Sequence, residues 1–369
     1  MADAPVPAPA EAALVPSAAA PGPHAAPLTI ALGPPEHGVT RFAVDCAQAA
    51  GTELLEVRHV ADLPAALQVA LPAALVAPAP TAAAAHPASQ PTPLHLHVTE
   101  PLFGPTPEDA AAVIEQLARD RPVAVTLHDV PQPAEGEDRC RRRSHCYQRI
   151  AAVAGLVVVS SAHERTLCAE AGIEVDAVIP LPVPVLAVPG RIVPDVRSVG
   201  VFGFLHPGKA VDVVAEAVAH LASAGDEQVT LRLLGEPADG HDEYVRAALE
   251  TVRAAGGRAE VTGRVDDDEL ARTLGEVTVP VALFRNVSAS GSLNTWAAAG
   301  RRPVTTDSAY TREIERDRPG SLLLADEGGL ARQLRDLLDE PAATRREPPP
   351  PGLDDLGRGY ADAWRKWLA

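Results

Sequence analysis

Short runs of apolar, often β-branched residues alternate with amphipathic stretches from Leu28 to the end of the chain. This alternation is typical of parallel sheets that are covered by helices on both faces. The predicted strands of the first half are 28–33, 93–99, 122–129, 156–161 and 176–183, and those of the second half are 198–204, 229–235, 259–263, 277–284, 303–307 and 321–326. The pattern therefore predicts an α/β protein with two successive doubly wound, Rossmann-like domains.

Helix signals fill the intervals between these strands. Thr106 is a good N-cap because Pro107 occupies the first helical position and acidic residues follow in the first turn, which predicts a helix to about residue 119. Other helices are expected over 39–50, closed by Gly51, and around 163–171, ending at Gly172.

Proline-rich segments mark the boundaries of the predicted domains. There are 37 prolines among 369 residues, about twice the usual share. Residues 1–27 are Ala/Pro low-complexity sequence without a periodic apolar face, which predicts a disordered tail. Residues 184–197 are expected to form a hinge between a first domain at 28–183 and a second domain at 198–345.

The last segment, 352–369, has a helical pattern. Tyr360, Trp364 and Trp367 are spaced by four and three residues, so they share one face of the predicted helix. An aromatic face of this kind must pack against another part of the protein.

Composition and charge exclude several classes of function. The net charge of −17 creates a field that repels polyanions, so nucleic acid is not an expected partner. The chain shows no secretory signal and no run of residues that would span a membrane, and its four scattered cysteines suit a reducing compartment. A cytoplasmic protein is expected.

The first candidate site is the segment 203–210, GFLHPGKA, where a strand leads through a glycine-bearing turn to Lys209. The chain has only two lysines, and a compact ammonium beside the N–H groups at the start of a helix suits a phosphate. The same string fits G-x-x-x-x-G-K. However, Ala210 replaces the Ser or Thr that holds Mg²⁺ in a P-loop, and Pro207 removes one amide donor.

Three further segments end strands or open helices, which is where open parallel sheets bind ligands. Ser290, Gly291 and Ser292 lie in a loop whose amides and hydroxyls would converge on an anion or a sugar, although an ordinary serine cap explains the loop equally well. His128 would exchange a proton near neutral pH, with Asp129 orienting it or raising its pKa, although a histidine at a strand end is by itself more often structural.

The third segment is the loop 33–38 after the first strand, where Gly38 lets the backbone approach a ligand closely. It lacks the G-x-G-x-x-G spacing, so NAD is not an expected cofactor.

A basic cluster, RCRRR at 139–143, stands out in this acidic chain. It would suit an anionic acceptor, a lipid headgroup or an acidic partner, and it is equally consistent with the solvated start of a helix. Nearby Cys140, His145, Cys146 and His163 do not have the spacing of zinc ligands, so no metal site is predicted from them.

Taken together, residues 28–369 resemble a retaining glycosyltransferase of family 4, in the group 1 glycosyl transferases. In the first domain the matching strings are PPEHGVTRFA (34–43), TEPLFG (99–104), VTLHDVPQ (125–132), VVVSSAHE (157–164) and VIPLPV (178–183). In the second they are GVFGFLHPGKAVDVVAEAV (200–218), LLGE (233–236), VTGRVDDDEL (261–270) and SGSLNTWAAAGRRPVTTD (290–307). The resemblance implies the GT-B fold, with two facing Rossmann-like domains and a C-terminal helix that crosses back to the first.

The resemblance also implies a reaction and a distribution of roles. A sugar would pass from a nucleoside-diphosphate-sugar donor on the second domain to a sugar, lipid or small-molecule acceptor on the first, with retention of configuration and without a metal or cofactor. Lys209 would neutralise the diphosphate leaving group. The resemblance implies that Gly38, Lys209, Ser290, Gly291 and Ser292 bind the donor and that His128 faces the acceptor. Beyond the resemblance, we expect Asp129 to act with His128 as a catalytic pair. We also expect further donor contacts from His206, Arg285, Asn294 and Thr295, and acceptor-side contacts from His37, Arg142 and Arg143.

The chain departs from the family pattern at three positions. Val287 and Thr295 stand where the family has two glutamates, and Phe204 stands where it has an arginine beside the lysine. These replacements leave open a catalytically impaired GT-B-like binding or scaffold protein as an alternative. A P-loop NTPase is a weaker alternative, because Ala210 does not offer a hydroxyl to Mg²⁺.

Overall fold

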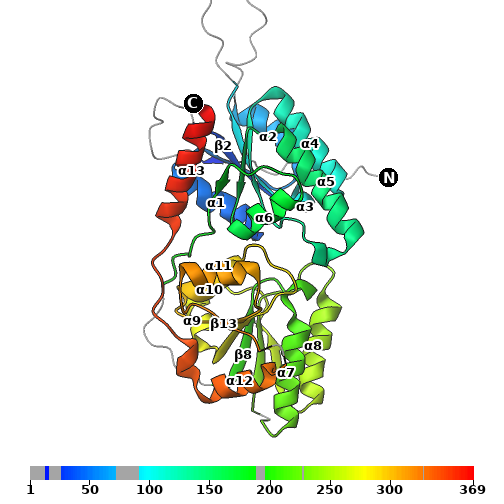
Figure 1. The fold of residues 1–369 in the computed structure, drawn as a ribbon, viewed down its shortest axis with the longest axis vertical. Helices are drawn as coiled ribbons and strands as arrows, with labels where there is room; N and C mark the ends of the chain where they lie inside the picture. Colours follow the sequence, from blue (N-terminus) through cyan, green and yellow to red (C-terminus); the bar gives the residue numbers. More distant parts are fainter. Residues whose placement is uncertain (1–12, 16–25, 72–90, 188–195, 227, 327) are drawn as a thin grey trace, which may run out of the picture. The chain divides into compact units, whose positions relative to one another are not determined.

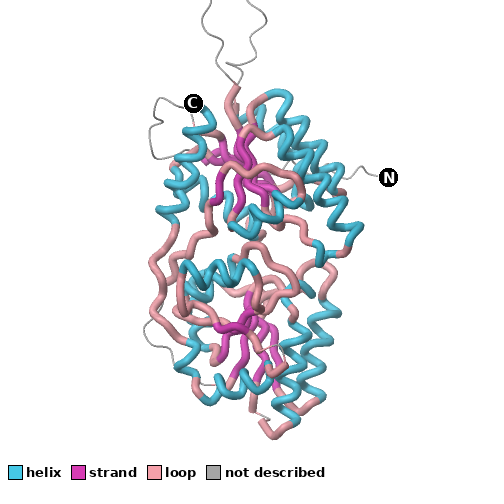
Figure 2. Tube along the Cα trace, in the orientation of Figure 1, coloured by secondary structure: helices cyan, strands magenta, loops and turns pink. Residues whose placement is uncertain are grey.

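The computed structural model describes residues 13–15, 26–71, 91–187, 196–226, 228–326 and 328–369. It divides the chain into two compact units. One comprises Met1–Pro180 together with Leu353–Ala369, and the other comprises Leu181–Gly352 (Figure 1). Each unit contains a sheet with helices on its two faces, as Figure 2 shows by colour. The predicted α/β class with two Rossmann-like domains is confirmed.

The sheet of the first unit has the strand order β1-β3-β2-β4-β5-β6-β7. Its strands are β1 (Ala13–Val15), β2 (Leu28–Leu32), β3 (Leu54–Val57), β4 (Leu94–Val98), β5 (Val123–Leu127), β6 (Leu156–Val159) and β7 (Ala177–Val178). Its helices are α1 (Gly38–Ala50), α2 (Leu63–Ala70), α3 (Glu100–Phe103), α4 (Pro107–Asp120), α5 (Glu137–Val153), α6 (Ala162–Glu170) and α13 (Leu353–Leu368), with 3₁₀ turns η1 (Val60–Asp62) and η2 (Pro133–Glu135). All strand pairs are parallel except β1 with β3.

Strand β1 corrects the prediction that residues 1–27 are disordered throughout. Residues 13–15 pair with the outer edge of β3, whose backbone groups would otherwise lack a neighbouring strand. Three consecutive apolar residues suffice for such an edge strand although they carry no helical or alternating pattern. Residues 1–12 and 16–25 lie outside the described part of the chain, so the remainder of that prediction is not tested.

Local capping follows the sequence signals closely. The Thr106 hydroxyl accepts a hydrogen bond from the Asp109 amide at 3.2 Å at the start of α4. Gly51 ends α1 in the left-handed conformation (φ 66°), which glycine adopts without steric cost. Strands β2, β4 and β5 are buried along their whole length, because helices cover both faces of the sheet.

Helix α13 packs on the first unit, as the family resemblance implied, and it does so through the predicted aromatic face. Tyr360 and Trp364 are buried, and Trp367 lies against Gly155, where a Cβ atom would meet the indole. Gly357 brings α13 so close to α1 that an added Cβ would lie 2.1 Å from the Ala49 carbonyl oxygen. The helix therefore belongs to the core of this unit although it follows the second unit in sequence.

The sheet of the second unit is parallel throughout and has the order β10-β9-β8-β11-β12-β13. Its strands are β8 (Ser198–Phe202), β9 (Thr230–Leu234), β10 (Arg258–Val261), β11 (Val279–Ala282), β12 (Val304–Thr305) and β13 (Leu323–Leu324). Its helices are α7 (Val211–Ser223), α8 (Asp242–Ala254), α9 (Asp267–Glu276), α10 (Gly291–Ala298), α11 (Ala309–Asp317) and α12 (Leu330–Asp339), with 3₁₀ turns η3 (Pro207–Lys209) and η4 (Pro341–Thr344).

The boundary between the units falls after Pro180, three residues before the predicted end of the first domain. The strand expected over 176–183 is limited to β7, because the prolines that follow it cannot donate a hydrogen bond to the ladder. Of the predicted hinge at 184–197, residues 188–195 lie outside the described chain, and the hinge stays a prediction. No helix within the described residues is both long and apolar enough to cross a membrane.

Candidate functional site

The second unit has a topological switch point at the carboxyl ends of β8 and β11. Strand β8 lies between β9 and β11, so the chain leaves β8 toward one side of the sheet and later returns to the other. Ligands of open α/β sheets bind at such a point, because the loops after the two strands diverge there. The loop after β8 contains Lys209, and the loop after β11 contains Ser290 and Ser292.

Lys209 joins these two loops. Its ammonium donates hydrogen bonds to the Phe202 carbonyl and to the Ser292 hydroxyl, both at 3.2 Å. It also lies 5.5 Å from the centre of the Phe284 ring. Burial lowers the pKa of Lys209 to about 8, and no carboxylate among the described residues acts on it. The site therefore holds an enclosed positive charge without a counter-ion, which suits an anionic ligand.

Two glycines make room for this ammonium. Gly203 has φ 102°, and a Cβ there would lie 3.2 Å from Lys209 Nζ. Gly235, at the end of β9, has φ 150°, and its Cβ would lie 2.2 Å from the Gly203 carbonyl oxygen. No side chain can be accommodated at Gly235 without moving the loop that surrounds the lysine.

Strained backbone conformations occur in the turns after β5 and β8, where the sequence predicted site residues. Among the described residues, Ala210 (φ 46°) and Asp129 (φ 51°) are the non-glycine residues with positive φ. Ala210 follows Lys209 directly, and Asp129 follows His128. Residues held in this region cost about 1–3 kcal/mol and concentrate at functional sites, so both observations favour the predicted locations.

The serine loop caps helix α10. The Ser290 hydroxyl accepts a hydrogen bond from the Leu293 amide at 3.4 Å and lies 3.0 Å from the Ser292 hydroxyl. Gly291 is exposed, and a Cβ there would meet no atom within 4 Å. The Ser292 hydroxyl at the start of α10 thus contacts the ammonium of Lys209, and the Ser290 hydroxyl lies beside it, as expected for a phosphate site at a helix N-terminus.

The other predicted donor residues are already occupied by contacts within the unit. His206 caps η3 by accepting from the Gly208 amide at 3.2 Å. Arg285 forms an ion pair with Asp212 and donates to the Pro207 carbonyl at 3.0 Å.

Asn294 and Thr295, on α10, are also engaged. The Asn294 amide donates to the Leu181 carbonyl at 3.0 Å and accepts from Arg318 at 2.7 Å. Thr295 donates to the Gly291 carbonyl of its own helix at 2.9 Å. The structure therefore groups Ser290 and Ser292 with Lys209. The side chains of Asn294 and Thr295 make structural contacts instead.

In the first unit, His37 and Gly38 begin α1 after β2. The His37 ring accepts a hydrogen bond from the Val39 amide at 3.2 Å, and burial lowers its pKa below the usual value. An added Cβ at Gly38 would meet no atom within 4 Å, so the start of this helix is open. His37 thereby caps the helix, while its predicted acceptor-side role is not tested.

His128 differs from its sequence-based description. It is only 6% exposed, and its Nε2 lies 3.2 Å from His97 Nδ1. Burial lowers its pKa to about 3, so the ring is neutral near pH 7. The expectation that Asp129 raises the pKa of His128 is wrong, because burial dominates. A neutral ring can donate or accept a hydrogen bond at the end of β5, but it is not a source of protons at this pH.

Arg143, which the sequence analysis placed on the acceptor side, is buried and contacts other residues of the first unit. Its buried guanidinium forms ion pairs with Glu100 and Glu135 and donates to the Asp129 carbonyl at 2.6 Å. Tyr147 donates to the neighbouring His128 carbonyl at 2.6 Å. Arg143 therefore fixes the strained turn after β5, and it has no exposed charge to offer an acceptor.

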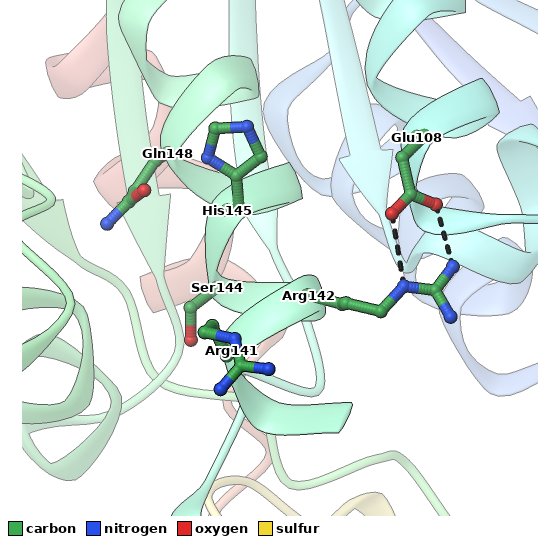
Figure 3. Close-up of a pocket in the computed structure, with 6 residues that line it drawn as sticks. All are labelled: Glu108, Arg141, Arg142, Ser144, His145 and Gln148. Carbon is green, nitrogen blue, oxygen red and sulfur yellow. Dashed lines mark hydrogen bonds and ion pairs between the residues drawn. The ribbon is translucent and has the colours of Figure 1, made fainter. Parts of the chain in front are cut away.

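Arg142 lies on the outer face of α5 in a shallow pocket (Figure 3). Its guanidinium points toward Glu108 on α4 and forms a two-point ion pair, with one distance of 2.9 Å. Arg141 pairs with Asp138 on its own helix. Both arginines are solvent-exposed, so the reading of this cluster as a solvated helix start explains them without a ligand.

Sequence reasoning did not single out His95 and His97. They alternate with apolar residues in β4, which is the signal that both side chains lie on one face of the sheet. The roles of Phe284 and Gly235 around Lys209 were also missed, because they depend on contacts between loops that are far apart in the chain.

Comparisons with known proteins agree with this architecture. The chain is similar in structure to HepE from Anabaena in complex with UDP (TM-score 0.56, 14% identity, 92% of this chain and 94% of that chain) and with UDP-glucose (0.54, 16%, 75% and 74%). It is also similar to sucrose-phosphate synthase from Thermosynechococcus elongatus (0.54, 18%, 75% and 71%). No curated protein sequence matches the chain.

The fold is therefore that of the GT-B glycosyltransferases, as the resemblance implied. Residues 196–340 match the family model described as Glycosyl transferases group 1. The matched residues lie within the second unit, which contains Lys209 and the serine loop.

Proposed function

We propose that this protein is a glycosyltransferase that moves a sugar from a nucleoside-diphosphate-sugar donor to an acceptor with retention of configuration. The observation that carries the proposal is the ammonium of Lys209, which is enclosed, has no carboxylate partner in the described part of the chain and hydrogen-bonds the serine loop at the switch point of the second sheet. A diphosphate leaving group needs such a charge, because negative charge develops on its oxygen in the transition state.

The proposed reaction breaks the bond between the sugar C1 and the diphosphate oxygen. The electron pair passes to that oxygen, where Lys209 and the first amides of α10 stabilise it. The acceptor oxygen forms the new bond to C1, and its proton passes to the departing diphosphate oxygen. None of these steps needs a metal ion at the diphosphate, since the lysine and the helix N-terminus supply the positive potential.

We assign the acceptor to the first unit, with His128 and Asp129 at the end of β5 as the residues beside it. This assignment follows the family resemblance, and the strained φ of Asp129 supports it. His128 would act as a neutral hydrogen-bond partner. Retention of configuration is likewise proposed from the resemblance. The HepE structures contain UDP and UDP-glucose, so UDP-sugars are the first donors to test.

The test is calorimetric binding of UDP, UDP-sugars, GDP-sugars and ADP-sugars, followed by nucleotide release with acceptor extracts. Lys209→Ala should weaken binding about 10- to 100-fold, because a charge-assisted hydrogen bond contributes roughly 1.5–3 kcal/mol. The matched control is Lys366→Ala, which removes the other lysine from the exposed surface of α13. The proposal fails if no nucleotide sugar binds, or if both variants bind like the wild type.

A second candidate function is nucleotide-sugar binding without transfer. It is favoured by Val287, which is buried, and by Thr295, which bonds its own helix, at the positions where the family has carboxylates. This candidate predicts Lys209-dependent binding with no release of nucleotide for any acceptor. Transfer to an acceptor would eliminate it.

A further inference from the structure

Three potential metal-binding side chains meet inside the first unit, and none of them belongs to the second unit or to its serine loop. Cys46 comes from α1, and His95 and His97 come from one face of β4. All three are buried, and one ligand atom from each lies within 4.8 Å of the others. Within the part of the chain that the structure describes, these three side chains form the cluster of potential metal ligands that lies close enough together to hold one ion.

One nitrogen of each imidazole has no partner. His95 Nδ1 and His97 Nε2 are both buried and make no hydrogen bond within the described structure. A buried polar atom left in this way costs about 1–3 kcal/mol, and two of them beside one thiol need an explanation. Aromatic rings lie beside both imidazoles. The centre of the Phe42 ring lies 5.2 Å from that of His97, and the centre of the Tyr360 ring lies 5.1 Å from that of His95.

The opposite nitrogens are held in place. His95 Nε2 lies 2.9 Å from the Thr126 hydroxyl, which in turn lies 3.0 Å from the Tyr360 hydroxyl. His97 Nδ1 lies 3.2 Å from His128 Nε2. Imidazoles that bind metals almost always use their second nitrogen for such a hydrogen bond, which fixes the tautomer and turns the remaining lone pair toward the ion.

We propose that Cys46, His95 and His97 bind one thiophilic metal ion in the core of the first unit. A thiolate and two imidazoles are soft or intermediate ligands that select Cu⁺ or Zn²⁺ over Mg²⁺ and Ca²⁺. Bonds of about 2.0–2.3 Å would draw the three ligand atoms together by roughly 1 Å. The metal–sulfur bond replaces the S–H bond, and the thiol proton leaves to solvent.

Cu⁺ fits this site better than Zn²⁺ for two reasons. With one thiolate, Cu⁺ gives a neutral complex, whereas Zn²⁺ leaves a positive charge in an apolar core. Structural zinc also takes four ligands, and the cluster supplies three. The same three side chains would hold either ion, so the experiment includes both.

The ion would connect the elements around it. Cys46 lies on α1, which packs against α13, and His95 lies against Tyr360 and Trp364 of α13. Metal binding would therefore stabilise the docking of the C-terminal helix. It is independent of nucleotide binding, so either proposal can fail without the other.

The test uses the full chain, unfolded with chelator and reductant and refolded without oxygen in the presence of Cu⁺ or Zn²⁺. After dialysis, the metal per chain is measured by mass spectrometry. Wild type should retain about one ion per chain, and Cys46→Ser should retain at least tenfold less. The matched control is Cys168→Ser, which removes another buried thiol of the same unit and should retain the metal like the wild type.

The bound ion should also raise the melting temperature of the wild type and leave that of Cys46→Ser unchanged. X-ray absorption on the loaded wild type gives an answer even where the serine variant does not fold, because it should show one sulfur and two nitrogen neighbours. The proposal is overturned if the wild type retains neither ion, if the serine variant retains as much metal as the wild type, or if no sulfur neighbour is seen.

Discussion

Replacing Lys209 by methionine tests the claim that an enclosed, uncompensated ammonium lies at the switch point of the second sheet. Methionine keeps the unbranched shape of the side chain and removes the charge. In the folded protein burial lowers the pKa of Lys209 from 10.5 to about 8. The unfolded chain therefore binds more protons at this residue between these two values, so the stability of the wild type must rise with pH in that window.

The magnitude follows from the two pKa values. Below about pH 8 the full cost of the charge is present, and it disappears as the pH approaches 10.5. Between about pH 7 and pH 9.5 the free energy of unfolding of the wild type should increase by about 2 kcal/mol relative to Lys209→Met. Other titrating groups are common to both proteins, so the difference cancels them.

The assay is urea denaturation of both proteins across this pH range, without nucleotide. Over the same pH range, the affinity of the wild type for UDP should fall as the pH rises, because the bound diphosphate needs the protonated ammonium of Lys209. A difference between the two proteins that does not change with pH would refute the reasoning. It would mean that Lys209 is solvated like an ordinary surface lysine.

Three more predictions concern packing and backbone. Tyr360→Ala should destabilise the protein by about 3–5 kcal/mol in thermal or urea unfolding, since the ring projects from α13 and is fully buried in the first unit; a cost below about 1 kcal/mol would contradict the packing. Gly235→Ala should weaken UDP binding more than tenfold in calorimetry, because its Cβ would displace the Gly203 carbonyl beside the lysine; unchanged affinity would show that the loop adapts. Glu100→Gln should lower the free energy of unfolding by about 3 kcal/mol, because the buried Arg143 guanidinium loses one of its two carboxylate partners. An unchanged free energy of unfolding would show that Glu135 alone compensates the charge of Arg143.

The sequence predicted the elements whose signals are local. The apolar runs of β2, β4, β5, β8 and β9 and the cap at Thr106 depend on neighbouring residues, and the structure has them within one or two positions. Strands β7, β12 and β13 are only two residues long, because their pairing is limited by flanking prolines and by the short overlap with the neighbouring strand. Such limits are set by partner strands and are not visible in a single run of residues.

The candidate site was predictable in part for the same reason. A rare lysine after a strand and a Ser-Gly-Ser loop after another strand are local features, and the sheet order brings them together. The environment of Arg143 was not predictable, because its partner Glu100 lies 43 residues away and turns an apparent surface charge into a buried one. The low pKa of His128 likewise depends on how completely the surrounding helices exclude water.

Helix α13 gives the first unit a discontinuous sequence, since residues 353–369 complete a core that begins at β2. During synthesis on the ribosome, every residue of the second unit is added to the chain before those residues. Until residues 353–369 are made, the apolar surface of the first unit beneath Tyr360 stays uncovered. By then the second unit already has all of its residues. Translation thus imposes an order of maturation in which the lobe made first is finished last.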